Sequence, residues 1–215
     1  MAKYPIFLNL EGRRVVVIGG GTVAVRKTQV LLDCGARLVV VADNIDKMIA
    51  AFGTQKNIEL IKSKYEKSYL PTAVLAIAST NDNEINKQIY KDCQELEILC
   101  NVVDVPELCD FFVPAVVKRG NLQIAISTNG NCPAYAGHLR KKLEELITEQ
   151  HGKFLEVLEI TRQNIIQEIT EPDKRKIILG KLCDDKSFDY FLKNGSENWL
   201  SYAEELIKSL HAEIL

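Results

Sequence analysis

The N-terminal half of the chain alternates short β-branched apolar runs with segments of helical pattern. The runs span residues 15–18, 38–42, 58–61, 74–78 and 98–103. Residues 23–34 separate the first two runs with apolar side chains at helical spacing, and residues 83–93 separate the last two. This alternation is typical of βαβ units, whose strands form a parallel sheet. Residues 1–113 are therefore expected to form an α/β domain.

A glycine-rich loop follows the first predicted strand and precedes the first predicted helix. Its residues, Gly19-Gly20-Gly21-Thr22-Val23-Ala24, fit the pattern G-x-G-x-x-G/A of Rossmann-type domains. In that pattern the first glycine allows a tight turn, the second lets the backbone approach a pyrophosphate, and the small third residue permits close packing. The amides of Thr22 and Val23 would point at a phosphate from the helix N-terminus. The alternative is a glycine-rich turn that holds no ligand.

Asp43 follows the second predicted strand, 22 residues after Gly21. An acid at this place accepts hydrogen bonds from the ribose hydroxyls of NAD and repels the 2′-phosphate of NADP, so NAD is the expected cofactor. Alternatively, Asp43 caps the next helix near Asp46. Arg26 and Lys27 oppose the dipole of the first helix, so they are either solvated charges or cations that face an anionic ligand.

Asp104 ends the sequence Asn101-Val102-Val103-Asp104 at the end of the fifth predicted strand. Ligands of open parallel sheets bind beyond the carboxyl ends of the strands, so Asp104 is expected near the reacting part of the cofactor. A carboxylate there could act as a general base, and partial burial would raise its pKa towards the useful range. Alternatively, Asp104 and Glu107 form a capping box. Cys109 is read as a small buried residue.

The pattern changes after residue 113. Residues 114–130 read as two strands joined at Arg119-Gly120-Asn121, which is a hairpin signal. A helix then begins at Pro133 and is expected to end at Gly152. Residues 114–150 hold five basic and three acidic side chains, which makes this the net-positive part of the chain.

From residue 153 onward the pattern predicts helices alone. They are expected at 154–168, 173–182, 187–192 and 197–210, punctuated by Pro172 and Gly195. The predicted architecture is a Rossmann-type domain at 1–113, a small α+β region at 114–150 and an all-helical domain at 151–215.

Composition and charge weigh against several classes of protein. The net charge of −2 gives no long-range field that would attract nucleic acid or an anionic membrane. The sequence has no apolar stretch long enough to span a bilayer, and its start lacks the features of a signal peptide, so a cytoplasmic location is expected. The six cysteines form no C-x-x-C pair and the three histidines lie far apart, so no metal site is expected.

Four segments together resemble the precorrin-2 dehydrogenase family, which is the dehydrogenase and ferrochelatase module of siroheme synthase. The segments are PIFLNLEGRRVVVIGGGTVAVRK, AIASTND, NVVDVPELCDFFVPAVVKRGNLQIAISTNGNCP and HLRKKLE, and they cover about residues 3–150 in order. The helical remainder matches in length and helical character only. No uroporphyrinogen methyltransferase domain follows, so the stand-alone form is expected.

The resemblance implies an enzyme that uses NAD to oxidise precorrin-2 to sirohydrochlorin, and that in some members also inserts ferrous iron to give siroheme. It implies a homodimer in which a Rossmann domain, a dimerisation region (here 114–150) and a helical domain enclose a cleft for the tetrapyrrole. Asp104 matches the family aspartate proposed to act in dehydrogenation and chelation. The residues expected to contact NAD are Gly19, Gly21, Thr22, Val23, Asp43, Asn44, Thr80, Asn101 and Val102.

The substrate implied by the resemblance carries eight carboxylates, and cations are expected to bind them. The residues expected at the substrate are Arg26, Lys118, Arg119, Cys132, His138 and Arg140. For each cation, a solvated surface position is the alternative. The strand edges of the hairpin could also be covered by a twofold partner.

Cys132 departs from the family, most members of which have serine before the proline. Serine is a good N-cap and cysteine is a poor one, so Asn129 and Asn131 are candidate substitutes for the cap. His138 is either an exposed helix residue or a group that assists proton transfer or iron delivery. Two alternative functions remain open: a chelatase or tetrapyrrole carrier without dehydrogenase activity, and a non-enzymatic regulatory module that senses NAD.

Overall fold

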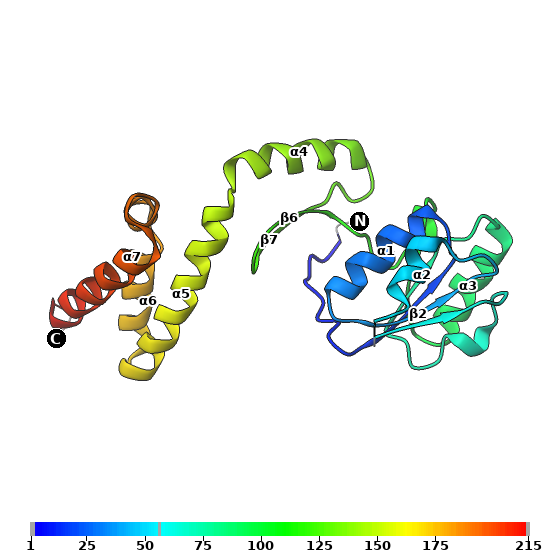
Figure 1. Ribbon diagram of the computed structural model, residues 1–215, viewed down its shortest axis with the longest axis horizontal. Coiled ribbons are helices and arrows are strands. Elements are labelled where there is room, and N and C mark those ends of the chain that lie inside the picture. Colours follow the sequence, from blue (N-terminus) through cyan, green and yellow to red (C-terminus); the bar gives the residue numbers. More distant parts are fainter. Residues whose placement is uncertain (1–2, 56, 214–215) are drawn as a thin grey trace. The chain divides into compact units, whose positions relative to one another are not determined.

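The computed structural model describes residues 3–55 and 57–213 (Figure 1). Within these residues, the first of two compact units, Met1–Val113, holds a parallel sheet of five strands in the order β3-β2-β1-β4-β5. The strands are β1 (Arg14–Ile18), β2 (Arg37–Val41), β3 (Ile58–Ile61), β4 (Leu75–Ala78) and β5 (Leu99–Val102). Each predicted apolar run is therefore confirmed as a strand, as is the α/β architecture.

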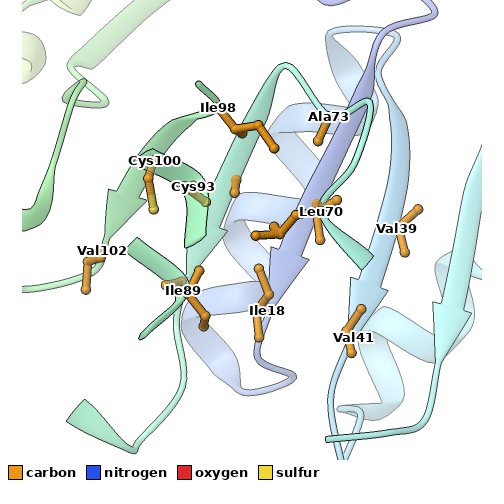
Figure 2. Close-up of a cluster of buried hydrophobic side chains, with 13 residues drawn as sticks. Ile18, Val39, Val41, Leu70, Ala73, Ile89, Cys93, Ile98, Cys100 and Val102 are labelled. Atoms are coloured by element: carbon orange, nitrogen blue, oxygen red, sulfur yellow. The ribbon is translucent and has the colours of Figure 1, made fainter. Parts of the chain in front are cut away.

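Helices cover both faces of this sheet. They are α1 (Thr22–Asp33), α2 (Lys47–Phe52) and α3 (Asn83–Glu95). Neighbouring residues of a strand point to opposite faces, so Ile18 of β1 belongs to one buried cluster with Ile89 of α3 (Figure 2). Val17 belongs to a second cluster with Leu31 of α1 and Ile49 of α2. Burial on both faces explains why the strands read as continuous apolar runs.

Three short elements of this unit were given no bounds by the apolar pattern, although a helix near Asp46 and one after Asp104 were considered for capping. They are α2 and the 3-10 helices η1 (Lys67–Tyr69) and η2 (Pro106–Leu108). The side chain of Asp46 caps α2 by accepting a hydrogen bond from the amide of Met48. Each of these elements is too short for the periodicity of apolar residues to reveal it.

The second unit, Pro114–Leu215, begins with an antiparallel hairpin of β6 (Ala115–Arg119) and β7 (Leu122–Ile126). Gly120 turns the chain between them with a φ of 57°. Helix α4 (Pro133–Leu146) begins at the predicted proline. It ends earlier than expected, because Thr148 and His151 form a capping box that starts α5 (Glu149–Glu168). Gly152, which was expected to end the helix, lies inside α5.

The remaining helices pack around one apolar core. Helix α6 (Pro172–Leu182) and helix α7 (Asp185–Glu213) follow α5, and α7 is broken at Gly195, whose backbone is not helical. The buried indole of Trp199 donates a hydrogen bond to the buried hydroxyl of Ser187 over 2.9 Å. The predicted helices of this region and the break at Gly195 are confirmed, whereas the predicted three-domain division stays a prediction.

A search of the described residues found no helix with the length and apolar character needed to cross a membrane.

Candidate functional site

The carboxyl ends of β1 and β4 form a topological switch point, because β1 pairs with β2 on one side and with β4 on the other. Ligands of open parallel sheets bind in the crevice beyond such a point. The glycine loop follows β1 there. Gly19 has a φ of 121°, and a Cβ at Gly19 would clash with the carbonyl oxygen of Ser79 after β4. A side chain is therefore excluded from the first position of the loop.

Gly20 is the one glycine of the loop to which the sequence pattern gives no role. A Cβ at this position would clash with the carbonyl oxygen of Asn44. The carbonyl oxygen of Gly20 also accepts a hydrogen bond of 2.9 Å from the amide of Asp46. Gly20 thus lets the segment after β2 cross the loop, a contact between positions distant in sequence that the local pattern does not reveal.

Gly21 differs from both of its neighbours because a Cβ there would meet no atom within 4 Å. Gly21 is exposed and is the N-cap of α1, and no side chain accepts hydrogen bonds from the first turn of this helix. Thr22 is exposed and Val23 is half-buried, while Ala24 is buried against the sheet. The open space and the uncapped helix N-terminus fit the pyrophosphate of a dinucleotide, which the backbone amides would bind.

Asp43 and Asn44 lie beyond the end of β2, and both are exposed. Because Asp46 caps α2, the alternative that Asp43 serves as this cap is wrong. The Asp43 carboxylate therefore does not accept the capping hydrogen bond of α2. Its place two residues beyond a strand that neighbours β1 fits an acid that receives ribose hydroxyls.

Thr80 follows β4 at the same edge of the sheet. Its hydroxyl donates a hydrogen bond of 2.7 Å to the side-chain oxygen of Asn86, whose amide group donates to the Thr80 carbonyl oxygen over 3.1 Å. Asn86 is buried in α3. The hydroxyl of Thr80 is thus used to join β4 to α3, and its predicted contact with a cofactor stays a prediction.

Asp104 lies two residues beyond β5 and has a φ of 61°, which L-residues rarely adopt. The N-cap of η2 is Val105 and no side chain caps this helix, so the predicted capping box of Asp104 and Glu107 is wrong. Asp104 is exposed rather than partly buried. Its carboxylate is left free to face a ligand.

Asn101 and Val102 end β5, and both are buried. The side chain of Asn101 donates a hydrogen bond of 2.9 Å to the carbonyl oxygen of Phe111. Val102 packs in the cluster beside α3 (Figure 2). Both side chains therefore support the protein itself, and their predicted contact with a cofactor is not tested.

Arg26 and Lys27 lie in the second turn of α1. Arg26 is exposed and Lys27 is half-buried. Burial lowers the pKa of Lys27, and the positive charge of Arg26 acts in the same direction, while the negative charge of Asp104 raises it. Lys27 thus lies within electrostatic reach of the turn that carries Asp104, and the predicted substrate contact of Arg26 stays a prediction.

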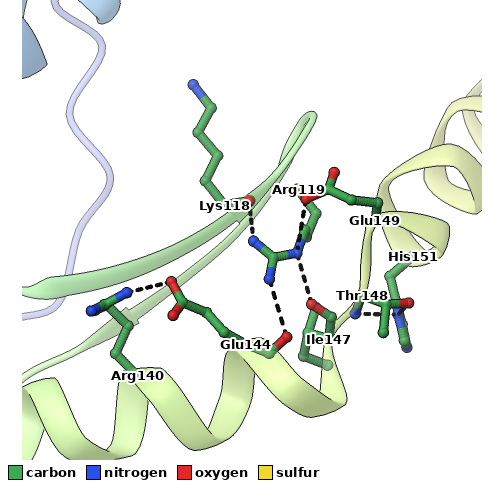
Figure 3. Close-up of polar contacts among 8 residues, drawn as sticks. All are labelled: Lys118, Arg119, Arg140, Glu144, Ile147, Thr148, Glu149 and His151. Carbon is green, nitrogen blue, oxygen red and sulfur yellow. Dashed lines mark hydrogen bonds and ion pairs between the residues drawn. The ribbon is translucent and has the colours of Figure 1, made fainter.

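Arg119 at the end of β6 has a structural role in the second unit. Its guanidinium donates hydrogen bonds to the carbonyl oxygens of Ile147 at 2.8 Å and Glu144 at 3.1 Å, and Nε lies 3.3 Å from the Glu149 carboxylate (Figure 3). Carbonyls at the end of a helix lack partners within the helix. Arg119 supplies these partners and ties the hairpin to the junction of α4 and α5, so no substrate is needed to explain it.

Two further cations were expected at the substrate. Arg140 forms an ion pair with Glu144 along α4. Lys118 is exposed and extends away from the Arg119 cluster (Figure 3). Among these three cations, Lys118 is the one without an ion-pair partner in the described part of the chain. Whether any of them binds substrate is not tested.

Cys132 is the N-cap of α4, and no side chain caps this helix. The expectation that Asn129 or Asn131 replaces the cap is therefore wrong. The Cys132 thiol is exposed, as is His138, whose ring stacks on Tyr135 with 6.2 Å between ring centroids. In the described residues, no group of three or more His, Cys, Asp and Glu side chains could hold a metal ion.

The fold and the glycine loop together define a dinucleotide-binding α/β protein. Residues 6–115, more than half of the chain, match the family model described as "Putative NAD(P)-binding". The chain belongs to this NAD(P)-binding family. Residues 119–146 also match the model described as "Sirohaem biosynthesis protein central".

Curated relatives carry the name siroheme synthase. The protein of Psychrobacter arcticus is 43% identical over 153 residues, which are 71% of this chain and 28% of the relative. The protein of Psychrobacter cryohalolentis is 36% identical over 214 residues, which are 100% of this chain and 40% of the relative. The chain thus spans less than half the length of either relative.

A solved structure, "SirC, precorrin-2 dehydrogenase", is similar over almost the whole chain. The TM-score is 0.78 at 25% sequence identity, and the match covers 94% of this chain and 100% of that chain. The similarity thus extends over both compact units.

Proposed function

We propose that this chain oxidises precorrin-2 to sirohydrochlorin with NAD as the hydride acceptor. One observation carries the proposal. The glycine loop and the exposed carboxylate of Asp104 lie at the same edge of one parallel sheet, where a dinucleotide and its substrate would meet. The relatives named siroheme synthase and the solved precorrin-2 dehydrogenase support this choice of substrate.

The chain offers a distinct group for each part of the dinucleotide. The amides of Thr22 and Val23, at the uncapped start of α1, would bind the pyrophosphate. The exposed carboxylate of Asp43 would accept hydrogen bonds from ribose hydroxyls and would repel a 2′-phosphate. The proposed cofactor is therefore NAD rather than NADP.

Oxidation of precorrin-2 removes a hydride and a proton. Bound NAD would accept the hydride at its nicotinamide ring. Asp104 is the proposed acceptor of the proton, because its carboxylate is exposed at this edge and is used by no helix cap. Lys118, which has no ion-pair partner among the described residues, is a proposed contact for a substrate carboxylate.

Insertion of ferrous iron is a second candidate activity. It is favoured by the match of residues 119–146 to the central model of sirohaem biosynthesis. Iron would be a substrate of this reaction, and Asp104 could accept pyrrole protons. A homodimer and a cytoplasmic location complete the proposal, and sedimentation of the purified protein tests the first of these.

The proposed activity can be tested in one cuvette. Purified protein is incubated anaerobically with enzymatically made precorrin-2 and NAD while the absorption spectrum is recorded, and ferrous iron is added afterwards. NADH appearing together with sirohydrochlorin is the expected result. A later siroheme spectrum, formed faster than without protein, would add the chelatase. A folded, NAD-binding protein without turnover would instead support the sensor or carrier.

The role of Asp104 is tested by Asp104→Asn. Asparagine tolerates the positive φ of this position, so the variant is expected to fold and to bind NAD. Turnover should fall about 10²- to 10⁴-fold, the usual contribution of a general base. Glu107→Gln, which removes an exposed acid from η2 three residues further along the chain, is the matched control and should keep its turnover. Normal turnover in Asp104→Asn would exclude the assigned role.

A further inference from the structure

The turn that carries Asp104 closes around the thiol of Cys109. The Cys109 Sγ lies 3.1 Å from the carbonyl oxygen of Val102 and 3.2 Å from that of Val105. These two carbonyls flank Asp104 on both sides. The amide of Val105 also donates to the carbonyl oxygen of Val102 over 3.3 Å. A single thiol group thus reaches both ends of the segment that presents the carboxylate.

The thiol is itself held by Asn101. The side-chain nitrogen of Asn101 lies 3.4 Å from the Cys109 Sγ and 2.9 Å from the carbonyl oxygen of Phe111, to which it donates. Asn101 is buried in β5 and forms an isolated antiparallel bridge with Cys109. Burial raises the pKa of the Cys109 thiol, so the sulfur keeps its proton and remains a donor.

The backbone of Asp104 needs such support. Its φ of 61° is uncommon for a residue with a side chain, and such conformations persist where surrounding structure determines them. The Asp104 side chain caps no helix. The described contacts that span Asp104 are the Val105 amide bond and the Cys109 thiol, so the thiol is the side chain that constrains this turn.

We propose that Asn101 and Cys109 are positioning residues that fix the turn from Val102 to Val105 and thereby aim the carboxylate of Asp104. This inference rests on the proposed function, since it assigns the residues that orient its base. In this proposal Asn101 acts by fixing the turn that carries Asp104, and it does not act by contact with a cofactor.

Three variants test the proposal. Cys109→Ala removes the donor, and Cys109→Ser restores a donor on a shorter side chain. Cys93→Ala removes a fully buried thiol from α3, in the cluster shown in Figure 2, and leaves the turn of Asp104 untouched, whereas Cys109 is half-buried. Each variant is measured for NADH affinity, for kcat and KM with precorrin-2, and for amide hydrogen exchange at Val105.

If Cys109 positions Asp104, the three variants should give a specific pattern of results. In Cys109→Ala the kcat should fall at least about tenfold, because small displacements of a reacting group are costly, while NADH affinity stays within about twofold. Exchange at the Val105 amide should accelerate. Cys109→Ser should recover part of the kcat, and Cys93→Ala should match the wild-type protein in kcat and in Val105 exchange, whatever stability it loses.

The two proposals fail in different ways. Wild-type protein without turnover would reject the proposed function, and the Val105 exchange rate would then still decide whether Cys109 holds the turn. Unchanged kcat and unchanged exchange in Cys109→Ala would overturn the positioning role. An equal loss of kcat in Cys93→Ala would also overturn it, because the effect would then follow from core stability alone.

Discussion

Gly152 of α5 packs directly on the backbone of Arg119 at the end of β6. A Cβ on Gly152 would lie 2.7 Å from the carbonyl oxygen of Arg119 and 3.2 Å from its Cβ. The hairpin therefore meets α5 at a position of this helix where any side chain would clash with the backbone of β6. The same arginine holds the end of α4 through its guanidinium, so Arg119 joins β6, α4 and α5.

The close approach at Gly152 predicts that Gly152→Ala destabilises the protein. The gain in helix propensity is at most about 1 kcal/mol, whereas overpacking against a backbone carbonyl typically costs about 1–3 kcal/mol. Gly180→Ala is the matched control, because Gly180 lies in α6 with open space around its Cα, and it should be neutral or stabilising. Chemical denaturation measures both free energies of unfolding. Equal effects in the two variants would contradict the close packing.

The hydrogen bonds of Arg119 predict a stability effect rather than an effect on substrate. Arg119→Met should lower the free energy of unfolding by about 2–3 kcal/mol, because it leaves the carbonyls of Ile147 and Glu144 without their charged donor. Lys118→Met, an exposed change on the same hairpin, should stay within about 0.5 kcal/mol. If Lys118 binds a substrate carboxylate, its loss should raise KM for precorrin-2 instead.

The glycine loop predicts opposite outcomes at neighbouring positions. Gly21→Ala adds a methyl group where the protein has open space, so folding should be preserved while NADH affinity falls about tenfold or more, through contact with the pyrophosphate. Gly20→Ala places the same group against the carbonyl oxygen of Asn44 and should lower stability by about 1–3 kcal/mol. Thermal unfolding and NADH titration separate the two. Tight NADH binding by Gly21→Ala would argue against this phosphate site.

The position of Asp43 predicts the choice between NAD and NADP. Asp43→Asn removes the charge that would repel a 2′-phosphate, so the preference for NAD should fall about tenfold. Asp46→Asn is the matched control, because it makes the same change in net charge three residues away and keeps a good N-cap on α2. The preference for NAD should stay unchanged in this variant. The ratio of kcat/KM for the two cofactors reports the outcome. An unaltered ratio in Asp43→Asn would mean that another group selects the cofactor.

Local patterns were sufficient to predict the sheet, most of the helices and the glycine loop. The strands could be read because both faces of the sheet are buried, which gives β1 and β4 unbroken apolar runs. The hairpin could be read because Gly120 supplies the positive φ that its turn requires. The end of α4 was misread because Thr148 and His151 start a new helix through a cap that the apolar pattern does not contain.

The roles of individual polar residues were harder to predict. The alternative in which Asp104 caps a helix is wrong, because the side chain of Asp104 caps none and is exposed. The bonds of the Arg119 guanidinium to carbonyls 25 and 28 positions away were not foreseen, and its substrate contact stays a prediction. A side chain's partner is set by which segments the fold brings together, and spacing along the chain does not contain that information.

By itself, the sequence determined which segments form the strands and most of the helices, and where a phosphate-binding loop follows a strand. These features depend on residues that are neighbours in the chain, so short-range sterics and apolar periodicity are enough to specify them. The tertiary structure alone decided that Gly20 and Gly152 must lack side chains, that Asp46 rather than Asp43 caps α2, and that the Cys109 thiol spans the turn of Asp104. Those outcomes depend on the distances between atoms of separate segments, which exist only once the chain has packed.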